Sequence, residues 1–355
     1  MANLYWPHKD QFRSREKKTA RRLQAWQAAE RAATKHLVFS HAFCLDGVGS
    51  AVVALRALGP EGVGVAYCQP DKMVKALRFV AEHPGRGRSL LVADLSFNPQ
   101  HFDDLVEAAA AVKAAGWRIE WRDHHHKQWE GLELDRLRAS LDVLTVNDDG
   151  TESGASLMQQ ALAPKDAFLK RFAETVRDRD IWANQLPDSE TLEYAITYMG
   201  TEAFTGHFVH AAPETPVVDK TVEAAADAQK AKQADHTQRI TSHARYATTA
   251  NGKVGVAYGW LPKNVGLHQM IADGCAVAIN VRPNGKMSIR SQKGAEVSHL
   301  IARDFNGGGH PNASGGDLGL EGLAYWMYIL RKGRVRRTKE VMASAVRHLE
   351  AIGQD

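Results

Sequence analysis

The sequence predicts two α/β domains, an N-terminal doubly wound parallel sheet and a smaller C-terminal α/β domain, joined by a helical linker. Three observations support this prediction. Short apolar runs alternate with helix-like segments between residues 36 and 162, a polar, alanine-rich run covers 222–244, and a second group of strand-like runs lies between 252 and 320. Strands that alternate with helices favour a parallel sheet covered on both faces.

In the first domain, which we place at 36–205, strands are expected at 36–40, 63–68, 89–93, 117–121 and 143–146. Helices are expected between them at 48–58, 72–82, 99–115 and 153–162. These strand-like segments are short and rich in apolar residues. Residues 1–35 are interpreted as a charged helical extension that precedes this domain.

The linker is placed at 206–250, because its run 222–244 has few large apolar residues and resembles a connecting helix. The second domain is placed at 251–325, with strands at 253–258, 276–281 and 287–291. The turn Pro283-Asn284-Gly285 predicts a hairpin between the last two strands. A helical tail is expected over 326–355, with its helix at 339–351.

The composition is that of an ordinary globular protein. A chain of 355 residues is long enough for two cores, and 44% apolar and 24% charged residues are usual values. The sequence has no apolar run long enough for a membrane span and no secretory signal, so a cytoplasmic location is expected. The three distant cysteines, Cys44, Cys68 and Cys275, fit a reducing compartment without disulfides.

Positive charge is local. The net charge of +4 does not indicate a strongly basic nucleic-acid-binding protein, but basic residues gather in 9–22 and again in 331–337. These clusters are either solvated helix faces or a source of electrostatic guidance for a polyanionic substrate.

Acidic and imidazole side chains follow three of the predicted strands. The residues are His41 and Asp46 after the first strand, Asp94 after the third, and Asp123, His124 and His125 after the fourth. Open α/β sheets bind ligands outside the carboxyl ends of their strands. Asp46 or Asp94 alone could be a helix cap, but a run of one aspartate and three histidines after an apolar strand has no packing rationale. The pattern therefore predicts a site at this edge of the sheet.

Carboxylate oxygens together with imidazole nitrogens suit Mn²⁺ or Mg²⁺ and can also hold Zn²⁺ or Fe²⁺. Several carboxylates in one site repel each other unless cations neutralise them. Two cations could clamp both the attacking and the leaving oxygen of a phosphoryl transfer, and one of them could lower the pKa of a bound water. The first domain is therefore expected to hold a divalent metal centre.

The second domain contains a glycine-rich stretch over 306–316. Consecutive glycines such as Gly308 and Gly309 let backbone N–H groups converge on an anion and let a phosphate approach the main chain. His310 could donate a hydrogen bond to that phosphate, and Arg290 could bind it with a forked pair of bonds. We expect this stretch to bind the substrate.

Together these motifs resemble the DHH/DHHA1 phosphoesterases, the superfamily of RecJ-type exonucleases, nano-RNases, cyclic-dinucleotide phosphodiesterases and exopolyphosphatases. The resemblance is carried by Asp123-His124-His125, by HAFCLDGVGSA, by ADLS around Asp94, by RDRDIW, and by GGGHPNASGG with SIRS upstream of it. It covers about residues 36–320.

The resemblance implies a first domain that binds two Mn²⁺ ions, with Mg²⁺ as an alternative, and a second domain that holds the nucleotide or phosphate end of the substrate. The implied metal ligands are His41, Asp46, Asp94, His124 and Asp178. Asp94 would bridge the ions, Asp123 would orient His124, and His125 would face the scissile phosphate as a transition-state stabiliser or proton donor. Asp178 is preferred to Asp180 because it precedes an aromatic residue by four positions.

One residue departs from the family pattern. Many members have Asp-x-Asp in the first motif, whereas this chain has Cys44-Leu45-Asp46. A thiol is a softer ligand than a carboxylate, so Cys44 is expected to be a packing residue near the site rather than a ligand of Mn²⁺.

The leading functional hypothesis is hydrolysis of phosphodiester or phosphoanhydride bonds in short oligonucleotides, linear dinucleotides or dinucleoside polyphosphates. One alternative is a nucleotide-binding or sensor protein whose metal centre is impaired by Cys44, and another is a zinc or iron site with unrelated chemistry. No membrane partner is expected. The sequence leaves the oligomeric state open, a homodimer included.

Overall fold

The structure, a computed structural model, describes residues 15–42, 44–259, 265–282, 284–319 and 336–352. The chain divides into two compact units, Met1–Gln229 and Lys230–Asp355. Part of the basic cluster in 9–22 and most of the cluster in 331–337 lie outside the described residues. Pro283 of the predicted turn also lies outside them.

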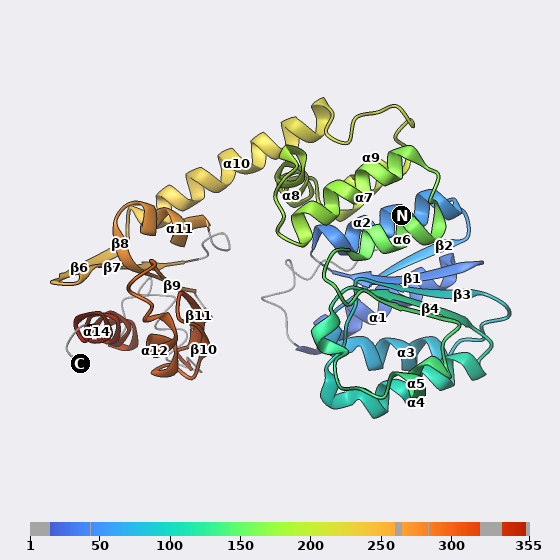
Figure 1. The fold of residues 1–355 in the computed structure, drawn as a ribbon, viewed down its shortest axis with the longest axis horizontal. Helices are drawn as coiled ribbons and strands as arrows, with labels where there is room; N and C mark the ends of the chain where they lie inside the picture. Colours follow the sequence, from blue (N-terminus) through green and yellow to red (C-terminus); the bar gives the residue numbers. More distant parts are fainter. Residues whose placement is uncertain (1–14, 43, 260–264, 283, 320–335, 353–355) are drawn as a thin grey trace. The chain divides into compact units, whose positions relative to one another are not determined.

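The first unit is built on a five-stranded sheet with the order β2-β1-β3-β4-β5, in which all neighbouring strands are parallel (Figure 1). The strands are β1 (His36–His41), β2 (Val63–Cys68), β3 (Ser89–Ala93), β4 (Arg118–Asp123) and β5 (Val143–Val146). This confirms the predicted parallel α/β fold. The strand order reverses between β1 and β3, and such a switch point is where open α/β sheets bind their ligands.

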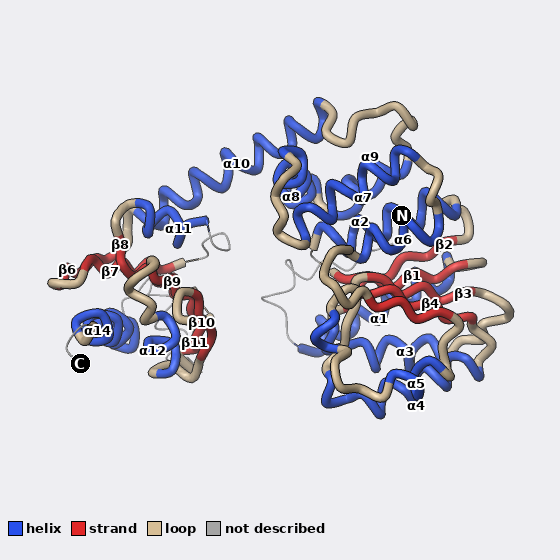
Figure 2. Tube along the Cα trace, in the orientation of Figure 1, coloured by secondary structure: helices blue, strands red, loops and turns tan. Residues whose placement is uncertain are grey.

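Helices cover both faces of this sheet (Figure 2). One face is covered by α1 (Arg15–Ala32), α3 (Met73–Ala81), α4 (Phe102–Ala114) and the short α5 (Leu134–Arg138). The other is covered by α2 (Leu45–Leu58), α6 (Gly154–Leu162), α7 (Ala167–Asp180), α8 (Pro187–Met199) and α9 (Thr201–Val209). Single 3-10 turns, η2 (Pro70–Lys72), η3 (Pro99–His101) and η4 (His126–Gln128), follow the strands β2, β3 and β4.

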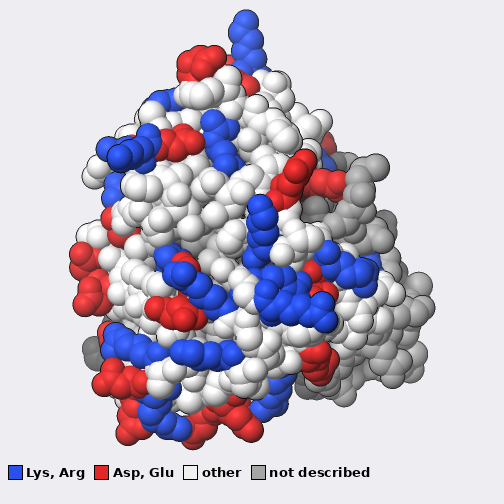
Figure 3. All heavy atoms as spheres, turned by 90° about the vertical axis from the view of Figure 1, so that its right-hand side faces the viewer, with Lys and Arg blue, Asp and Glu red and all other residues white. Residues whose placement is uncertain are grey.

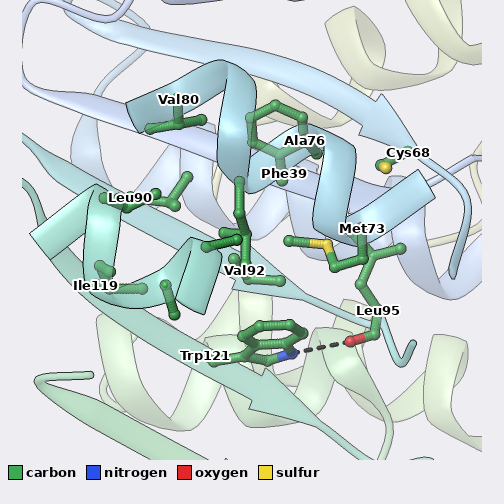
Figure 4. Packing of buried hydrophobic residues seen from close by; sticks show 14 of the residues in the cluster. Phe39, Cys68, Met73, Ala76, Val80, Leu90, Val92, Leu95, Ile119 and Trp121 are labelled. Carbon is green, nitrogen blue, oxygen red and sulfur yellow. Dashed lines mark hydrogen bonds between the residues drawn. The ribbon is translucent and has the colours of Figure 1, made fainter. Parts of the chain in front are cut away.

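Alternate side chains of the strands enter two different cores. Phe39, Val92 and Trp121 pack among the helices of the first face, and the Trp121 indole donates a 2.8 Å hydrogen bond to the Leu95 carbonyl (Figure 4). Val38 enters the core on the opposite face. Because the strands are buried on both sides, the ends of neighbouring strands are held in fixed register.

The second unit contains a mixed sheet with the order β10-β11-β9-β8-β7-β6, in which only β7 and β8 are parallel among the described strands. Its strands are β6 (Arg245–Thr249), β7 (Gly252–Tyr258), β8 (Cys275–Val281), β9 (Lys286–Ser291), β10 (Gly308–His310) and β11 (Ala313–Asp317). Its helices are α11 (Val265–Ala272), α12 (Ser298–Arg303) and α14 (Arg336–Glu350), and α10 (Lys220–Thr241) crosses the boundary between the units. The hairpin between β8 and β9 is as predicted, whereas β6, β10 and β11 were not expected.

The two faces of this second sheet are covered unequally. Ile279 and Ile289 pack on one face with Ile301 of α12 and Val341 of α14. On the other face, Ala278 and its apolar neighbours lie under α11. Arg290 is directly opposite Ala278 in the β8–β9 pair and therefore belongs to the α11 face. No described helix is both long and apolar enough to cross a bilayer.

Candidate metal centre

The ends of β1, β3 and β4 bring the predicted ligands to one edge of the first sheet. Ser40 is the register partner of Ala93, and Ala93 is the partner of Arg122. The residues that follow each of these positions, His41, Asp94 and Asp123, therefore come next to one another at the carboxyl end of the sheet. This edge is the switch point of the strand order.

One group of ligand atoms lies at the end of β1. The Cys44 Sγ is 3.2 Å from His41 Nδ1 and 3.0 Å from Asp94 Oδ2, and His41 Nδ1 is 3.6 Å from the same carboxylate oxygen. These three atoms lie within 4.8 Å of one another. We call His41, Cys44 and Asp94 the thiol half-site.

A second group surrounds His124. Its Nε2 atom is 3.1 Å from Asp94 Oδ1, 3.6 Å from Asp46 Oδ2 and 3.4 Å from Asp180 Oδ2. We call Asp46, His124 and Asp180 the carboxylate half-site. The two oxygens of Asp94 point to different half-sites, as a bridging ligand requires.

Backbone groups hold Asp46 in place. Its buried carboxylate accepts hydrogen bonds from the N–H groups of Gly154 (2.6 Å) and Ala155 (2.8 Å) at the beginning of α6. A Cβ on Gly154 would lie 2.5 Å from the Asp94 Cβ, so only glycine fits there. Gly154 was not predicted as a site residue. The sequence feature that could have indicated it is the Ser153-Gly154 pair at the start of the helix after β5.

Asp94 has a left-handed backbone with a φ of 50°. Side chains other than glycine adopt this region rarely, and such residues cluster at functional sites. The Asp94 N–H donates to the Arg122 carbonyl at 3.2 Å, which fixes the turn out of β3. Neither Asp46 nor Asp94 is the N-cap of the helix that follows its strand, because Cys44 and Asn98 occupy the N-cap positions of α2 and η3.

Asp123 positions His125. The His125 Nδ1 is 2.8 Å from Asp123 Oδ1, and the Trp129 indole donates to the other oxygen at 2.7 Å. Asp123 is fully buried, whereas the His125 side chain is 30% exposed. The expectation that Asp123 orients His124 is corrected by this geometry, since both oxygens of Asp123 are engaged by His125 and Trp129.

The preference for Asp178 over Asp180 is also corrected. The Asp178 carboxylate accepts hydrogen bonds from the N–H groups of Gln185 (2.8 Å) and Leu186 (3.1 Å), and it thereby closes the loop after α7. Asp180 lies two residues further along the helix, on a different side of it, and faces His124. The structure brings Asp180, and not Asp178, to the other ligands.

The centre concentrates negative charge. Among the residues that the structure describes, no Lys or Arg forms an ion pair with Asp46, Asp94 or Asp180; their ion-pair partners are histidines. Burial and the nearby carboxylates raise the pKa of Asp46 well above its usual value, and burial and Asp94 raise the pKa of Asp180 to about 6. Such crowding is relieved by cations.

The imidazoles provide the compensating positive charge. Burial acts to lower the pKa of His124, but its bond to Asp94 and the charges of Asp46 and Asp180 outweigh it and raise the pKa to about 10. Burial acts to raise the pKa of Asp94, but hydrogen bonds from His124 and His41 hold it below its usual value. A divalent cation bound here would take the place of the imidazole protons, and the oxygen, nitrogen and sulfur donors fit such a cation.

The predicted substrate-binding residues come together on the α11 face of the second sheet. His310 of β10 is directly opposite Ala313 of β11, which in turn is opposite Arg290 of β9. Directly opposite residues of antiparallel strands project to the same side, so His310 and Arg290 flank the small Ala313. We call these three residues the anion row.

Glycines and a second arginine complete this surface. A Cβ on Gly308 would meet no atom within 4 Å, whereas Gly309 has a φ of +138° and lies against Ser314. On the same face, the Arg282 guanidinium donates to the Ser288 hydroxyl at 3.1 Å. Arg282 was not predicted from the sequence. The alternation of side chains along the predicted hairpin places it on the same face as Ser288 and Arg290, and this pattern could have indicated it.

Comparison by sequence gives a distant relative. No protein-family model matches the chain. An uncharacterized protein of Acanthamoeba polyphaga mimivirus is 22% identical over 298 aligned positions, and the match covers 79% of this chain and 66% of that protein. The chain thus spans less than two thirds of the length of this relative.

Two solved structures are also similar. A DHH domain described as a member of the s1p family of ribosomal proteins matches with a TM-score of 0.54 and 14% identity, over 92% of this chain and 89% of that one. The exonuclease RecJ bound to manganese matches with a TM-score of 0.43 and 14% identity, over 92% and 94% of the two chains. The resemblance seen in the sequence motifs is therefore confirmed at the level of architecture: this chain has the fold of the DHH-domain proteins.

Proposed function

We propose that this protein is a metal-dependent phosphoesterase that hydrolyses phosphodiester or phosphoanhydride bonds of short nucleotide substrates. The observation that carries the proposal is the convergence of His41, Asp46, Asp94, His124 and Asp180 at the switch point of the first sheet. Buried carboxylates and imidazoles without a Lys or Arg partner among the described residues are suited to divalent cations.

Two Mn²⁺ or Mg²⁺ ions are the cofactors that we propose for a carboxylate-rich centre of this kind. His41 and Asp94 would contribute to one ion, and Asp46, His124 and Asp180 to the other, with Asp94 shared. When bound, such ions neutralise charge on the phosphoryl group and lower the pKa of the attacking water. Asp46 would hold its ligand geometry because two backbone N–H groups fix its carboxylate.

His125 is the proposed proton donor. Its Nδ1 hydrogen bond to the buried Asp123 fixes the ring, so Nε2 is the atom that can meet the substrate. Burial acts to lower the pKa of His125, but the hydrogen bond and the charge of Asp123 outweigh it and raise that pKa, so the ring keeps its proton to a higher pH than a free imidazole does. The ring would pass this proton to the leaving oxygen as the phosphorus–oxygen bond breaks.

The anion row of the second unit is proposed to hold the nucleotide or phosphate end of the substrate. His310 and the Arg290 guanidinium can donate to one phosphate, and the open position at Gly308 lets that phosphate approach the main chain. A short substrate is favoured because this row offers groups for one phosphate. On the face of the first unit seen in Figure 3, Lys and Arg are interspersed with Asp and Glu.

A hydrolysis panel tests the proposal. Purified protein with Mn²⁺ would be given linear dinucleotides, cyclic dinucleotides, diadenosine polyphosphates, pyrophosphate and 5′-phosphorylated single strands of increasing length, with His125→Ala as the control. We expect turnover that is fastest on the shortest substrates and is lost in the variant. No turnover on any substrate would refute the function, and processive degradation of the longest strands would refute the substrate class.

A nucleotide-binding protein with an impaired metal centre is the second candidate, and it is favoured by Cys44 in the first motif. Metal-stimulated hydrolysis distinguishes this candidate from the phosphoesterase. Tight nucleotide binding without any metal-stimulated hydrolysis would support it, whereas turnover that requires Mn²⁺ would exclude it.

A further inference from the structure

We propose that Cys44 is a thiolate ligand of the metal centre, so that the thiol half-site prefers Zn²⁺, Fe²⁺ or Co²⁺ to Mn²⁺ or Mg²⁺. This inference rests on the proposed function only in that both concern the same centre. It replaces the expectation that Cys44 is merely a packing residue. It also restricts the proposed Mn²⁺ or Mg²⁺ to the carboxylate half-site, so that the two half-sites are chemically different.

The distances in the thiol half-site are those of a set of ligands around one cation. Zinc bonds of about 2.0–2.3 Å to nitrogen, oxygen and sulfur place tetrahedral ligands about 3.3–3.8 Å apart. The three atoms of the half-site are separated by 3.0, 3.2 and 3.6 Å. The ligands would have to separate by only a few tenths of an ångström to accept the cation.

The backbone directs the Cys44 thiol into the centre. Cys44 is the N-cap residue of α2, with an extended backbone (φ −112°, ψ 156°), and its Sγ accepts the Gly47 N–H at 3.2 Å. A Cβ on Gly47 would lie 2.2 Å from the His41 carbonyl oxygen, so this tight turn, and with it the position of the sulfur, depends on glycine.

The surroundings of Cys44 differ from those of the other two cysteines. Cys68 and Cys275 lie in apolar cores, where a thiol acts as a small hydrophobic group. The sulfur of Cys44 instead contacts an imidazole and a carboxylate. Packing therefore explains Cys68 and Cys275, and it does not explain Cys44.

The other half-site lacks a sulfur donor. Asp46, His124 and Asp180 offer oxygen and nitrogen atoms, which suit Mn²⁺ or Mg²⁺, whereas thiolate selects softer cations. When a cation enters the thiol half-site, the S–H bond of Cys44 breaks, a metal–sulfur bond forms, and the proton leaves to solvent. A centre that holds two different metals follows from this asymmetry.

Titration of the metal-free full chain with Co²⁺ tests the inference by a signal that does not depend on activity. We expect a sulfur-to-cobalt charge-transfer absorption band in the wild type and in a Cys68→Ser, Cys275→Ser double variant, and no such band in Cys44→Ser. In Cys44→Asp, the preference for Zn²⁺ over Mn²⁺, measured by competition, is expected to fall by roughly tenfold or more.

The outcomes separate this inference from the proposed function. Calorimetric binding of Co²⁺ without the band, or a band that survives in Cys44→Ser, would overturn the thiolate ligand even if hydrolysis is observed. The band without hydrolysis of any substrate would support the ligand and count against the function. If Cys44→Ser does not fold, the presence or absence of the band in the double variant, whose only thiol is Cys44, decides the question.

Discussion

The two sheets of this protein present their functional groups in different ways. In the first unit, acids and imidazoles stand at the ends of parallel strands, where Asp46 and Asp94 are 0% and 2% exposed. In the second unit, His310 and Arg290 stand on one face of the mixed sheet, in antiparallel strands on either side of Ala313. Strand ends gather buried charge around one point, whereas a sheet face displays separate donors to a ligand.

This difference predicts two kinds of mutational effect. Groups at the strand ends share neighbours and a common charge balance, so that one substitution changes the whole centre. Groups on the sheet face make fewer shared contacts, so substitutions there are expected to weaken binding without removing the chemistry. The largest effects are therefore expected in the first unit.

Asp94→Asn is expected to have the largest effect, because its two carboxylate oxygens serve both half-sites. We predict a fall in kcat of about a thousandfold or more, together with the loss of at least one bound metal. Hydrolysis assays and metal titration by calorimetry measure both quantities. Near-normal activity in a folded Asp94→Asn protein would show that Asp94 is not a bridging ligand of both half-sites.

His125→Ala is expected to lower kcat by about 10²–10⁴-fold, because the ring supplies a proton to the leaving group. Metal binding should be nearly unchanged, since His125 is in neither half-site and its Nδ1 atom is bonded to Asp123. Steady-state kinetics and calorimetry on the same sample separate the two effects. A loss of metal with a matching loss of activity would instead make His125 a ligand.

Asp180→Asn and Asp178→Asn form a matched pair two residues apart on α7. We predict about a hundredfold loss of activity in Asp180→Asn and little loss in Asp178→Asn. The latter should lower the free energy of unfolding by about 1–2 kcal/mol, because it weakens two hydrogen bonds to the loop after α7. Kinetics and urea unfolding on both variants check this, and the reverse pattern would restore Asp178 as the ligand.

In the second unit, Arg290→Lys is expected to raise KM by about tenfold with a small change in kcat, because lysine cannot form the forked pair of bonds. Gly308→Ala should act in the same direction without loss of stability, since its Cβ meets no atom. Gly307→Ala is the contrasting variant: its Cβ would lie 2.0 Å from the Gly315 carbonyl oxygen and should destabilise the hairpin. A large fall in kcat in Arg290→Lys would contradict a purely binding role.

The smallest effect is expected at Asp304, which belongs to neither site and pairs with side chains of α14. Burial acts to raise its pKa, but hydrogen bonds from Ser344 and His348 and the charge of Arg347 outweigh it and lower the pKa. Because the folded pKa is depressed, the stabilisation is present above the unfolded pKa of about 4 and is lost as the pH falls through the folded value. Asp304→Asn should therefore destabilise the protein by about 0.5–1 kcal/mol at neutral pH and by less in acid, as urea unfolding at both pH values would show.

Much of the first unit could be predicted from the sequence because its strands are apolar runs between helices with clear boundaries. The strand β6 was missed because it is polar and partly exposed, and β10 because it consists of two glycines and a histidine. Apolar periodicity does not identify such strands, because they are formed by pairing with a neighbouring strand.

The candidate site was predicted in outline but not in detail. The edge of the sheet and most of its acids follow from the ends of the strands. The choice between Asp178 and Asp180 depends on the direction in which each side chain leaves α7, and the pairing of Asp123 with His125 depends on Trp129, which only the folded chain brings near. These side-chain directions and contacts are set by the packing of the folded chain and cannot be predicted from the local sequence.

The most direct test of the central claim is an anomalous-scattering map of crystals grown with Mn²⁺ and Zn²⁺. The account predicts two metal peaks about 3.5–4 Å apart on either side of Asp94, one next to His41 and Cys44 and the other next to Asp46, His124 and Asp180. Metal peaks elsewhere on the protein, with none beside Asp94 at saturating metal concentrations, would contradict it.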